Sequence, residues 1–477
     1  MLACYDFVSI MDDDETTVLS TLAATNSGRR LLDIAAVLRE AGGRAVLVGG
    51  AVRDGLLGLP IKDLDVEVFD IELAPLKQIL AGFGEVLSIG QSFGVLIVSG
   101  LAIDFSLPRK DSKVAPGHRG FKIEVDPQLS FDEASRRRDL TINSMGIDIT
   151  SRELLDPHGG RADLKARVLR ATDPTCFGED PLRALRVAQM AARFRMTIDP
   201  DLVEICAALD LSELPGERLY EEFRKLLLKG REPSRGLAFL RESRLLHHFP
   251  ELEALIDVPQ DAVWHPEGDV WTHTLMALDR AAQLREGESS EDEALMFAVL
   301  CHDFGKPATT AEIDGRLRSR GHDRLGAEPT RAFLGGLRAS AKLTEMVVAL
   351  VEQHLAPALL IEQRATPKAF RKLARKLAAA GVSMRLLERV ARADHMGRTT
   401  EDAVAGRFPA GDVFIEQADS LAVDTRGPKD VVLGRHLIAR GHTPSPEFAE
   451  ILDRCRDVQD ETGLADPEEI LDQVLRN

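Results

Sequence analysis

Three aspartates in the N-terminal part of the chain have the residue type and the spacing of a metal site. Asp63 and Asp65 lie at positions i and i+2 of the stretch DLDVEVF, which alternates acidic and apolar residues. Such alternation predicts a half-buried strand, on which both carboxylates project from the same face. Asp104, between apolar residues in the later stretch LAIDFSL, is predicted to line that face as well. Converging carboxylate oxygens suit Mg²⁺, which keeps its remaining coordination positions for water and phosphates.

An Asp-x-Asp pair alone is weak evidence, because such pairs are usually solvated strand acids and also occur at the metal of glycosyltransferases. The glycines Gly49 and Gly50, just upstream, sharpen the interpretation. Without Cβ atoms the backbone can press its N–H groups against a triphosphate, and the helix predicted to follow offers its positive N-terminal end. Arg53 is predicted to donate to phosphate oxygens. The pattern is not the G-x-G-x-x-G of dinucleotide folds, so we expect a nucleoside triphosphate held on two metal ions.

The elements predicted to position these residues are short strands alternating with helices. A helix through LLDIAAVLREAG is expected to be capped by Asn26-Ser27 and ended by Gly42-Gly43. The segment between Pro108 and Pro127 is basic, polar and rich in turn residues, so we predict a loop there. The predicted strands are RAVLV, DLDVEVF, EVLSI, GVLIV and LAIDFSL, with a helix at LAPLKQILAGF and a last hairpin formed by MGIDIT and ELLD.

From Pro181 onward the pattern is helical almost without interruption, with short Pro and Gly punctuation. A second helical unit is expected after WHPEGDVWTHTL, which begins at 264, and a C-terminal segment near Gly406. The predicted organisation is an N-terminal extension, a head, a helical neck and body, a second helical domain and a helical tail, at residues 1–29, 30–170, 171–258, 259–405 and 406–477 respectively.

Composition narrows the class of protein. A chain of 477 residues is too long for one ordinary core. Its N-terminus lacks the basic start and long apolar segment of a secretory signal, and we expect no stretch to span a membrane. The five cysteines form no Cys-x-x-Cys pair, which fits reduced thiols, so we predict a cytoplasmic protein.

Charge bears on the partners of the chain. The net charge of −17 argues against wholesale adhesion to nucleic acid. Basic residues nevertheless dominate between Glu362 and Arg389, where positions 364, 368, 371, 372, 375, 376, 385 and 389 are Lys or Arg. A stripe that contacts nucleic acid and an ordinary solvated helix face are both consistent with this run.

Four stretches in sequence order resemble the class II nucleotidyltransferases, the family of bacterial tRNA CCA-adding enzymes and poly(A) polymerases. They are GGAVRDGLLGLPIKDLDVEVF, RRRDLTIN, DPHGGRADL and GEDPLRALRVAQMAARF. The resemblance extends through the helical body and the HD module to about residue 400. It implies an α+β fold, with a mixed-sheet nucleotidyltransferase head of the DNA polymerase beta-like type, an all-helical body and a helical HD domain.

The resemblance assigns roles residue by residue. Asp63 and Asp65 match the catalytic metal-binding pair, and Asp104 falls where the family places an acidic residue. Asp180 and Arg183 match a base-reading pair; at i and i+3 of one helix, an acceptor beside a donor would accept cytosine and adenine and reject uracil and guanine. The other nucleotide-binding residues that it implies are Gly50, Arg53, Arg138, Asp139, Asn143 and Arg186, with an acid that accepts from the ribose 2′-OH.

A second set of residues lies in the C-terminal helical unit. A histidine, an adjacent His-Asp pair and a distant aspartate occur in the order His273, His302-Asp303 and Asp394. This order resembles the HD phosphohydrolase superfamily, in which these residues would ligate a divalent metal such as Ni²⁺, Co²⁺ or Mn²⁺. His322 and His354 match positions that hold a second metal in some members. The expected chemistry is attack of a metal-activated water on a phosphoester.

The resemblance therefore implies template-independent addition of CCA to tRNA 3′ ends from CTP and ATP, with Mg²⁺ in the head and no DNA or membrane partner. An A-adding enzyme or poly(A) polymerase is the nearest alternative, although IGQSFGVLIV at 89–98 lacks the basic element associated with that branch. An HD phosphohydrolase with a vestigial head is an alternative of another class. An intact set of head carboxylates argues against it.

Overall fold

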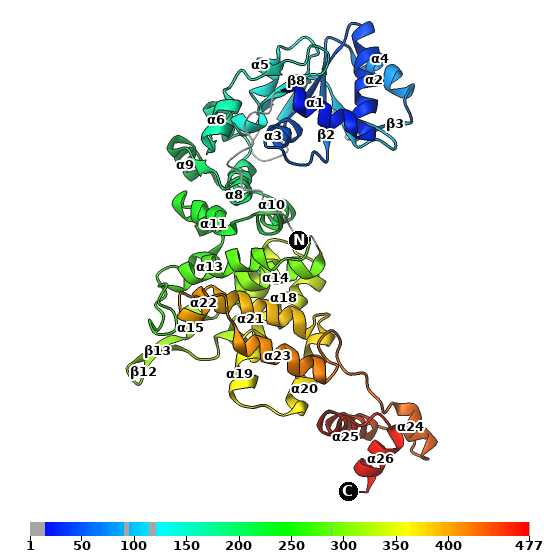
Figure 1. The fold of residues 1–477 in the computed structure, drawn as a ribbon, viewed down its shortest axis with the longest axis vertical. Coiled ribbons are helices and arrows are strands. Elements are labelled where there is room, and N and C mark those ends of the chain that lie inside the picture. The colour runs from blue at the N-terminus through cyan, green and yellow to red at the C-terminus, as the bar shows by residue number, and fades with distance from the viewer. Residues whose placement is uncertain (1–14, 90–94, 114–120, 288, 477) are drawn as a thin grey trace. The chain divides into compact units, whose positions relative to one another are not determined.

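The computed structural model describes residues 15–89, 95–113, 121–287 and 289–476. They form two compact units (Figure 1). The first contains the chain up to Leu214 together with Glu242–Leu245, and the second contains Pro215–Arg241 and the chain from Leu246 onward. The predicted body, 171–258, contributes helices to both units. The predicted domain boundaries stay predictions.

A seven-stranded mixed sheet forms the centre of the first unit, in the order β3-β4-β5-β2-β1-β8-β9. The pair β2–β5 is parallel, whereas the other pairs of this sheet are antiparallel. The strands are β1 (Arg44–Val48), β2 (Leu64–Phe69), β3 (Val86–Ile89), β4 (Val95–Val98), β5 (Ile103–Ser106), β8 (Gly146–Asp148) and β9 (Leu154–Leu155). The mixed-sheet head is confirmed, and so is the final hairpin, β8–β9.

The two faces of β2 have different chemistry. Leu64, Val66 and Val68 are buried on one face, as the alternation in the sequence predicts. On the other face Phe69 packs in an apolar cluster with Val46, Val48, Leu129, Phe131 and Ala134. That face carries Asp65 at the opposite end of the strand, so one sheet face holds both a small core and the carboxylates.

The helices of the first unit cover this sheet and continue beyond it. Helix α2 buries Leu31, Ile34 and Leu38 and is capped by Thr25, whose Oγ accepts from Gly28 N–H at 2.9 Å, rather than by Asn26-Ser27. The helices are α1 (Glu15–Ala24), α2 (Asn26–Glu40), α3 (Gly50–Leu56), α4 (Leu73–Ala81), α5 (Phe131–Ser135), η1 (Thr141–Asn143), α6 (Gly160–Ala166), α7 (Pro174–Phe177), α8 (Leu182–Phe194) and α9 (Pro200–Ala207). A short parallel pair, β10 (Val168–Leu169) with β11 (Thr197–Ile198), lies among them.

The predicted loop between Pro108 and Pro127 is wrong in part. Strands β6 (Arg109–Lys113) and β7 (Phe121–Val125) pair antiparallel there, with Arg109 opposite Val125. The stretch FKIEV alternates apolar and charged residues, a strand signal that the surrounding turn residues obscured. Residues 114–120 lie outside the described part of the chain, as do residues 90–94 of the stretch IGQSFGVLIV.

The second unit is helical apart from one hairpin, β12 (Thr310–Ile313) with β13 (Arg316–Ser319), which the sequence did not predict. Its first helices are α10 (Gly216–Lys229), α11 (Pro233–Glu242), η2 (Leu245–His248), α12 (Pro250–Glu253), α13 (Val270–Gln283), α14 (Ser290–Cys301), α15 (Lys306–Thr309) and α16 (His322–Leu325). The remainder are α17 (Ala327–Gly336), α18 (Ala341–Gln353), α19 (Ala356–Glu362), α20 (Pro367–Ala379), α21 (Met384–Met396), α22 (Glu401–Val404), α23 (Pro409–Ser420), α24 (Gly434–Ala439), α25 (Glu447–Thr462) and α26 (Pro467–Leu475).

One stretch, Ala341–Glu362, is long and apolar enough to cross a membrane by length and composition. It comprises α18 and α19. Val347, Leu350 and Val351 of α18 are fully buried, and this helix contacts α14 and α17. Burial in the core of the second unit therefore accounts for its hydropathy.

The basic run on and around α20 is engaged in ion pairs. Arg375 Nε lies 3.1 Å from Oδ1 of the buried Asp460 on α25, and Lys372 Nζ lies 2.6 Å from Asp457. Lys368, Lys376, Arg385 and Arg389 also pair with carboxylates, namely Glu461, Glu352, Asp419 with Asp424, and Asp292. Because acidic neighbours neutralise the run, the structure favours an ordinary helix face over a stripe that contacts nucleic acid.

Candidate active sites

The first candidate site is built by strand pairing. Asp65 on β2 lies opposite Asp104 on β5 in the parallel ladder, and Asp63 directly precedes β2. All three side chains are exposed on the sheet, whereas their neighbours Leu64 and Ile103 are buried. The pairing of β2 with β5 therefore brings together the three carboxylates that the sequence singled out.

Electrostatics shows that these carboxylates repel one another. Partial burial raises the pKa of Asp65, and the charges of Asp104, Asp63 and Glu67 raise it further against the opposing effect of Arg138. Partial burial and the charge of Asp63 raise the pKa of Asp104 as well. Like charges held this close favour a bound cation, because the cation relieves both the repulsion and the desolvation. The donor set therefore fits a hard divalent metal.

Gly49 explains why a backbone turn lies beside the carboxylates. It precedes α3 with φ of +72°, a conformation that side chains with a Cβ rarely adopt. A Cβ at this position would lie 3.0 Å from Nη1 of Arg138 and 3.9 Å from Oδ2 of Asp65. The glycine thus lets the backbone, the guanidinium and the carboxylate approach one another. Gly50, the predicted nucleotide-binding residue, is the first residue of α3.

Glu67 is a residue of this site that the sequence reasoning missed. It follows Asp65 on the same face of β2, is 1% exposed, and pairs with Arg137 and, at 3.5 Å, with Arg138. Its Oε2 and the Nε atoms of both arginines are buried without hydrogen-bond partners. The sequence contains a signal for this residue, because Glu67 lies two positions after Asp65 on the same predicted strand face. Glu67 holds the two guanidinium groups beside the aspartates.

Asp139 and Asn143 belong to a buried network. Asn143 Nδ2 donates to Asp139 Oδ1 at 3.0 Å, and Arg186 Nε donates to Asp139 Oδ2 at 2.7 Å. Burial alone would raise the pKa of Asp139, but Arg186 and the hydrogen bond from Asn143 outweigh it, so the pKa is lowered. Asp139 is therefore an ionised acceptor, the property expected of a group that binds a ribose hydroxyl.

Arg53 is a buried residue in the structure. It is 4% exposed, its Nε and Nη2 donate to Asp54 at 2.8 and 2.7 Å, and its Nη1 donates to Asn143. In the structure these partners engage all three nitrogens, and Arg53 positions Asn143. The predicted contact of Arg53 with phosphate stays a prediction. The sequence could not show this, because Asn143 approaches only in the tertiary fold.

Asp180 and Arg183 do not share a helix. Helix α8 begins at Leu182, and Asp180 lies before it with Oδ1 3.2 Å from Leu182 N. The Arg183 guanidinium donates to the backbone carbonyls of Cys176 and Arg137, both at 2.7 Å. Pro181 is the residue before the first helical position, and Arg183 N–H donates to Asp180 O at 3.0 Å in the turn that starts the helix. The base-reading role stays a prediction, now with Asp180 on the loop before α8.

The second candidate site gathers residues from five helices of the second unit. His273 lies on α13, His302 and Asp303 follow α14, His322 begins α16, and His354 follows α18. Asp394 lies on α21. All six predicted metal ligands are buried, and they form two groups whose ligand atoms converge, His273–His302–Asp394 and Asp303–His322–His354.

Backbone carbonyls orient three of the histidines. Nδ1 of His302, His322 and His354 each lies 2.7 Å from a carbonyl, of Val299, Ser319 and Val351 respectively. Nδ1 must therefore carry the proton, and the Nε2 lone pair faces inward. Nε2 of His322 lies 3.2 Å from Nε2 of His354. Two such lone pairs repel each other unless a cation lies between them.

The carboxylates complete the geometry of two metal positions. Nε2 of His273 lies 3.0 Å from Asp394 Oδ1, and Nε2 of His302 lies 3.9 Å from the same oxygen. Asp303 bridges the groups, with Oδ2 3.2 Å from His302 and Oδ1 3.4 Å from His322. Ligand atoms each about 2.1 Å from one ion lie roughly 3–3.5 Å apart, close to these separations. Nε2 of His302 and Oδ1 of Asp303 are buried and make no hydrogen bond, so the site fits metal ions.

Burial and neighbouring charges together shift the pKa values of the ligands. It lowers the pKa of His354 to about 3, so this imidazole is neutral, as a metal ligand must be. Burial would raise the pKa of Asp394, but Arg398 and His273 lower it well below its usual value. The pKa of Asp303 is likewise lowered, against burial, by His302 and Lys306. Neutral imidazoles and ionised carboxylates are the ligating forms of both residue types.

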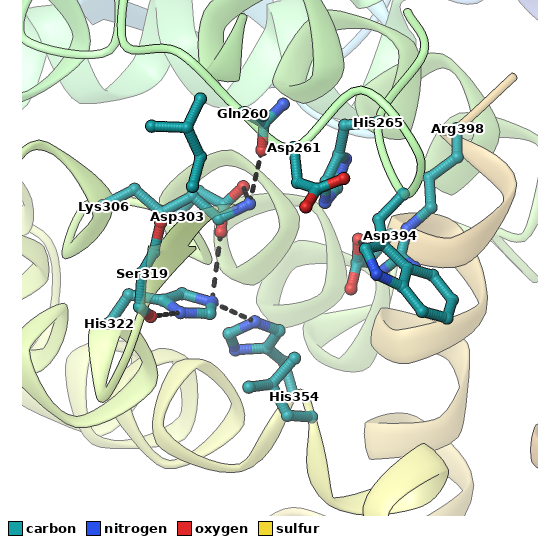
Figure 2. Close-up of a pocket in the computed structure, with 13 residues that line it drawn as sticks. Gln260, Asp261, His265, Asp303, Lys306, Ser319, His322, His354, Asp394 and Arg398 are labelled. Carbon is teal, nitrogen blue, oxygen red and sulfur yellow. Dashed lines mark hydrogen bonds and ion pairs between the residues drawn. The ribbon is translucent and has the colours of Figure 1, made fainter. Parts of the chain in front are cut away.

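A cavity of about 230 Å³ opens onto these ligands. Figure 2 shows Asp303 and Asp394 on opposite sides of it, with His322 below Asp303 and His354 at the lower centre. Lys306 and Arg398 also line it, and Lys306 Nζ lies 2.7 Å from Asp303 Oδ2 and bonds Gln260 Oε1 at 2.7 Å. Two cations beside a metal site suit an anionic substrate such as a phosphoester.

Sequence reasoning missed Glu267, which supports His273 from behind. Its Oε1 lies 2.8 Å from His273 Nδ1 and 2.8 Å from His265 Nδ1, and its side chain is 1% exposed. A carboxylate on the far nitrogen fixes the tautomer and the ring orientation of a metal-binding histidine. The residue occurs in the quoted stretch WHPEGDVWTHTL, but nothing in its spacing to His273 marks it as a partner.

Three family models match the chain in order. They are the Poly A polymerase head domain over residues 45–170, the probable RNA and SrmB-binding site of polymerase A over 195–256, and the HD domain over 270–390. The multifunctional CCA protein of Neisseria meningitidis is 38% identical over 314 residues, which cover 65% of this chain and 72% of the relative. That of Methylococcus capsulatus is 38% identical over 320 residues, with 65% and 72% covered.

The chain belongs to the multifunctional CCA protein family. It is a nucleotidyltransferase with an HD domain, as the sequence motifs predicted, and the family is metal-dependent. The fold agrees with solved structures. The Bacillus stearothermophilus CCA-adding enzyme in complex with CTP has a TM-score of 0.65 at 21% identity, with 95% of this chain and 98% of that chain covered. The Thermotoga maritima CCA-adding enzyme complexed with tRNA has a TM-score of 0.61 at 19% identity, with 97% and 98% covered.

Proposed function

We propose that this multifunctional CCA protein adds CCA to tRNA 3′ ends from CTP and ATP. The observation that carries the proposal is the convergence of Asp63, Asp65 and Asp104 beside Arg138 in a chain with this family's head domain. The tRNA 3′ oxygen attacks the α-phosphorus, the bond from that phosphorus to the bridging oxygen breaks, and pyrophosphate leaves. Bound at the three carboxylates, Mg²⁺ supplies charge stabilisation for the attacking and leaving oxygens.

The residues around the carboxylates have distinct roles in this proposal. Arg138, held by Glu67, donates to the phosphates of the incoming nucleotide. Asp139, kept ionised by Arg186, accepts from the ribose 2′-OH and so favours ribonucleotides. Arg53 orients Asn143 within the same network. Asp180 presents an acceptor and Arg183 a donor to the base.

Incubation of a tRNA lacking CCA with each labelled nucleotide, followed by gel sizing, tests this proposal. We expect incorporation of two CMP and then one AMP, and none of UMP or GMP. Addition of a single AMP without CMP identifies an A-adding enzyme, and a long adenylate tail identifies a poly(A) polymerase. Either product contradicts CCA addition.

We propose a second activity, metal-dependent hydrolysis of phosphoesters in the HD domain. The facing Nε2 lone pairs of His322 and His354 and the buried, unbonded Nε2 of His302 support it. Imidazole-rich donor sets favour Ni²⁺, Co²⁺ or Mn²⁺ over Mg²⁺, and such an ion when bound supplies an activated water. Lys306 and Arg398 hold the phosphate while water adds to phosphorus and the alcohol leaves. Release of phosphate from a phosphomonoester, assayed with each metal after chelation and reloading, tests this activity.

A further inference from the structure

A series of contacts in the head links Arg183 to β2, the strand that carries Asp65. Glu67 follows Asp65 on the same face of β2 and is 1% exposed. Its Oε1 accepts from Nη2 of Arg137, and the backbone carbonyl of Arg137 accepts in turn from Nη2 of Arg183 at 2.7 Å. Two contacts through Arg137 therefore connect the guanidinium of Arg183 to the strand of the head carboxylates.

The guanidinium of Arg183 is held in one orientation. Nη1 donates to Cys176 O at 2.7 Å and Nη2 to Arg137 O at 2.7 Å, while Cζ lies 6.0 Å from the centroid of the buried Phe177 ring. A guanidinium carries five N–H donors in one plane, so these contacts fix the plane and leave donors for a ligand. Because both acceptors are backbone carbonyls, the direction of the remaining donors depends on where those carbonyls lie.

The ion pair with Glu67 anchors the side chain of Arg137. This side chain is 20% exposed, and its Nε is buried without a hydrogen-bond partner. A pair this deeply buried resists separation, because the charge left behind would stay desolvated and uncompensated. Arg137 is therefore fixed to β2 at its guanidinium end and presents its carbonyl to Arg183 at the other end.

Glu67 serves two guanidinium groups with different tasks. Its Oε2 lies 3.5 Å from Nη2 of Arg138, whose Nη1 would lie 3.0 Å from a Cβ on Gly49. In the proposed function Arg138 donates to the phosphates, which all four nucleotides share. Arg137 instead contacts Arg183, which faces the base, the part in which the nucleotides differ. Loss of the first contact weakens every nucleotide alike, and loss of the second changes the choice among them.

We propose that Glu67 is a positioning residue for base choice, because it holds Arg137, whose carbonyl aims Arg183 at the base. The inference rests on the proposed nucleotidyl transfer and adds a specificity-determining residue that touches no substrate. A displacement of about 1 Å at a positioned group can cost up to about 10²-fold. Loss of the anchor therefore relaxes the preference for CTP and ATP over UTP and GTP, although Asp180 and Arg183 are both still present.

The first test is the ratio of kcat/KM for CTP to that for UTP, measured with the full chain, Mg²⁺ and a tRNA lacking CCA. We expect Arg137→Met to lower this ratio roughly 10-fold or more. Arg137→Lys keeps a cation for Glu67 and should retain most of the ratio. Glu67→Gln should lower the ratio as Arg137→Met does, and should also weaken both nucleotides through Arg138. Arg136→Met is the matched control, because the Arg136 side chain is 52% exposed and pairs with Asp132 at the surface.

The second test needs no turnover. Calorimetric titration of the full chain with CTP and with UTP, in Mg²⁺ and without tRNA, gives a ratio of Kd values that should change in the same variants. Combining Glu67→Gln with Arg137→Met then shows whether the two residues act on base choice through one contact. If they do, the double variant loses no more of the CTP-to-UTP ratio than Arg137→Met alone, because residues that act through one contact are not additive.

Three results overturn the inference. One is an unchanged CTP-to-UTP ratio in Arg137→Met that is folded by circular dichroism, which leaves Glu67 acting on Arg138 alone. Another is additive loss of the ratio in the double variant, and the third is an equal loss in Arg136→Met. Arg137→Met leaves Glu67 paired with Arg138, so it decides the question even if Glu67→Gln unfolds. If the wild type adds no nucleotide to tRNA, the nucleotidyl transfer proposal fails, and the calorimetric titration still decides whether Glu67 governs base choice.

Discussion

Asp65 and Asp104 lie opposite each other in the parallel pair of strands β2 and β5. Their side chains share one exposed face with Asp63, and the pKa values of both are raised. Without a cation this arrangement is unfavourable, so it stores electrostatic repulsion that a metal relieves. We therefore expect the three carboxylates to destabilise the paired strands β2 and β5 when no metal is bound.

Asp65→Asn tests this expectation. Because the folded-state pKa of Asp65 is raised, its charge destabilises the fold as pH rises from the unfolded-state pKa through the folded one. At neutral pH in EDTA we expect slower hydrogen exchange of β2 and β5 amides in the variant, with no difference at a pH low enough to protonate the carboxyl. Added Mg²⁺ should slow the hydrogen exchange of these amides in the wild type but not in the variant.

Nucleotide addition by Asp65→Asn should fall by at least about 10³-fold, since several kcal/mol of transition-state stabilisation are lost. Near-wild-type addition by Asp65→Asn or Asp63→Ala with Mg²⁺ alone contradicts the metal assignment.

Base choice can be separated from folding at Asp180. Asp180→Asn keeps an Oδ1 that can accept from Leu182 N–H, but it adds a donor where the carboxylate only accepts. We expect kcat/KM for CTP and ATP to fall roughly 10- to 100-fold relative to UTP and GTP, the range of one lost recognition pair. Arg183→Lys should give a similar change. An equal loss with all four nucleotides identifies a structural role, and the bonds of Arg183 to the carbonyls of Cys176 and Arg137 make that the main alternative.

The two activities should separate by site. His302 belongs to the second unit and Asp65 to the first. We expect His302→Ala to abolish phosphoester hydrolysis, including that of 2′,3′-cyclic substrates, while addition of CCA survives, and Asp65→Ala to do the reverse. Circular dichroism checks that each variant is folded. Loss of both activities in a folded His302→Ala protein contradicts independent sites.

Glu267 should act as a positioning residue for the HD metal. Glu267→Ala removes the carboxylate behind His273, and loss of such a support typically lowers metal affinity about 10- to 100-fold. Glu267→Gln keeps an oxygen that accepts from Nδ1 and should lose less. Metal affinity is measured by competition with a chelator, with the exposed Glu312→Gln on β12 as the control. Equal affinity in Glu267→Ala and in wild type excludes this role.

Two ion pairs between α20 and α25 should differ in strength. Arg375→Ala leaves Asp460, which is 2% exposed, as a buried carboxylate without this partner, and such a loss costs about 3–5 kcal/mol. Lys372→Ala removes a pair whose side chains are both more than half exposed, so it should cost less than about 1 kcal/mol. Hydrogen exchange of α25 amides measures the difference. Similar protection of these amides from exchange in both variants contradicts a larger stabilising contribution from the Arg375–Asp460 ion pair.

Local patterns in the chain determined which residues were candidates. Alternation in DLDVEVF determined the strand and the shared face of its acids, and the order of the histidines and aspartates marked the HD ligands. The strand and the HD ligands could be predicted because periodicity and side-chain chemistry can be read from a single sequence. The helices α4, α8, α9, α10 and α11 follow from periodicity in the same way.

Partners distant in the sequence were decided only by the tertiary structure. Glu67 meets Arg138, Arg53 meets Asn143, and Glu267 meets His273 because strands and loops bring them together. Asp180 lies before the first residue of α8, and the basic run on α20 has acidic partners on α25. Each of these contacts depends on which two side chains approach each other, and the packing of whole helices and strands determines this. A local pattern can place a side chain on a face, but only packing decides what that face meets.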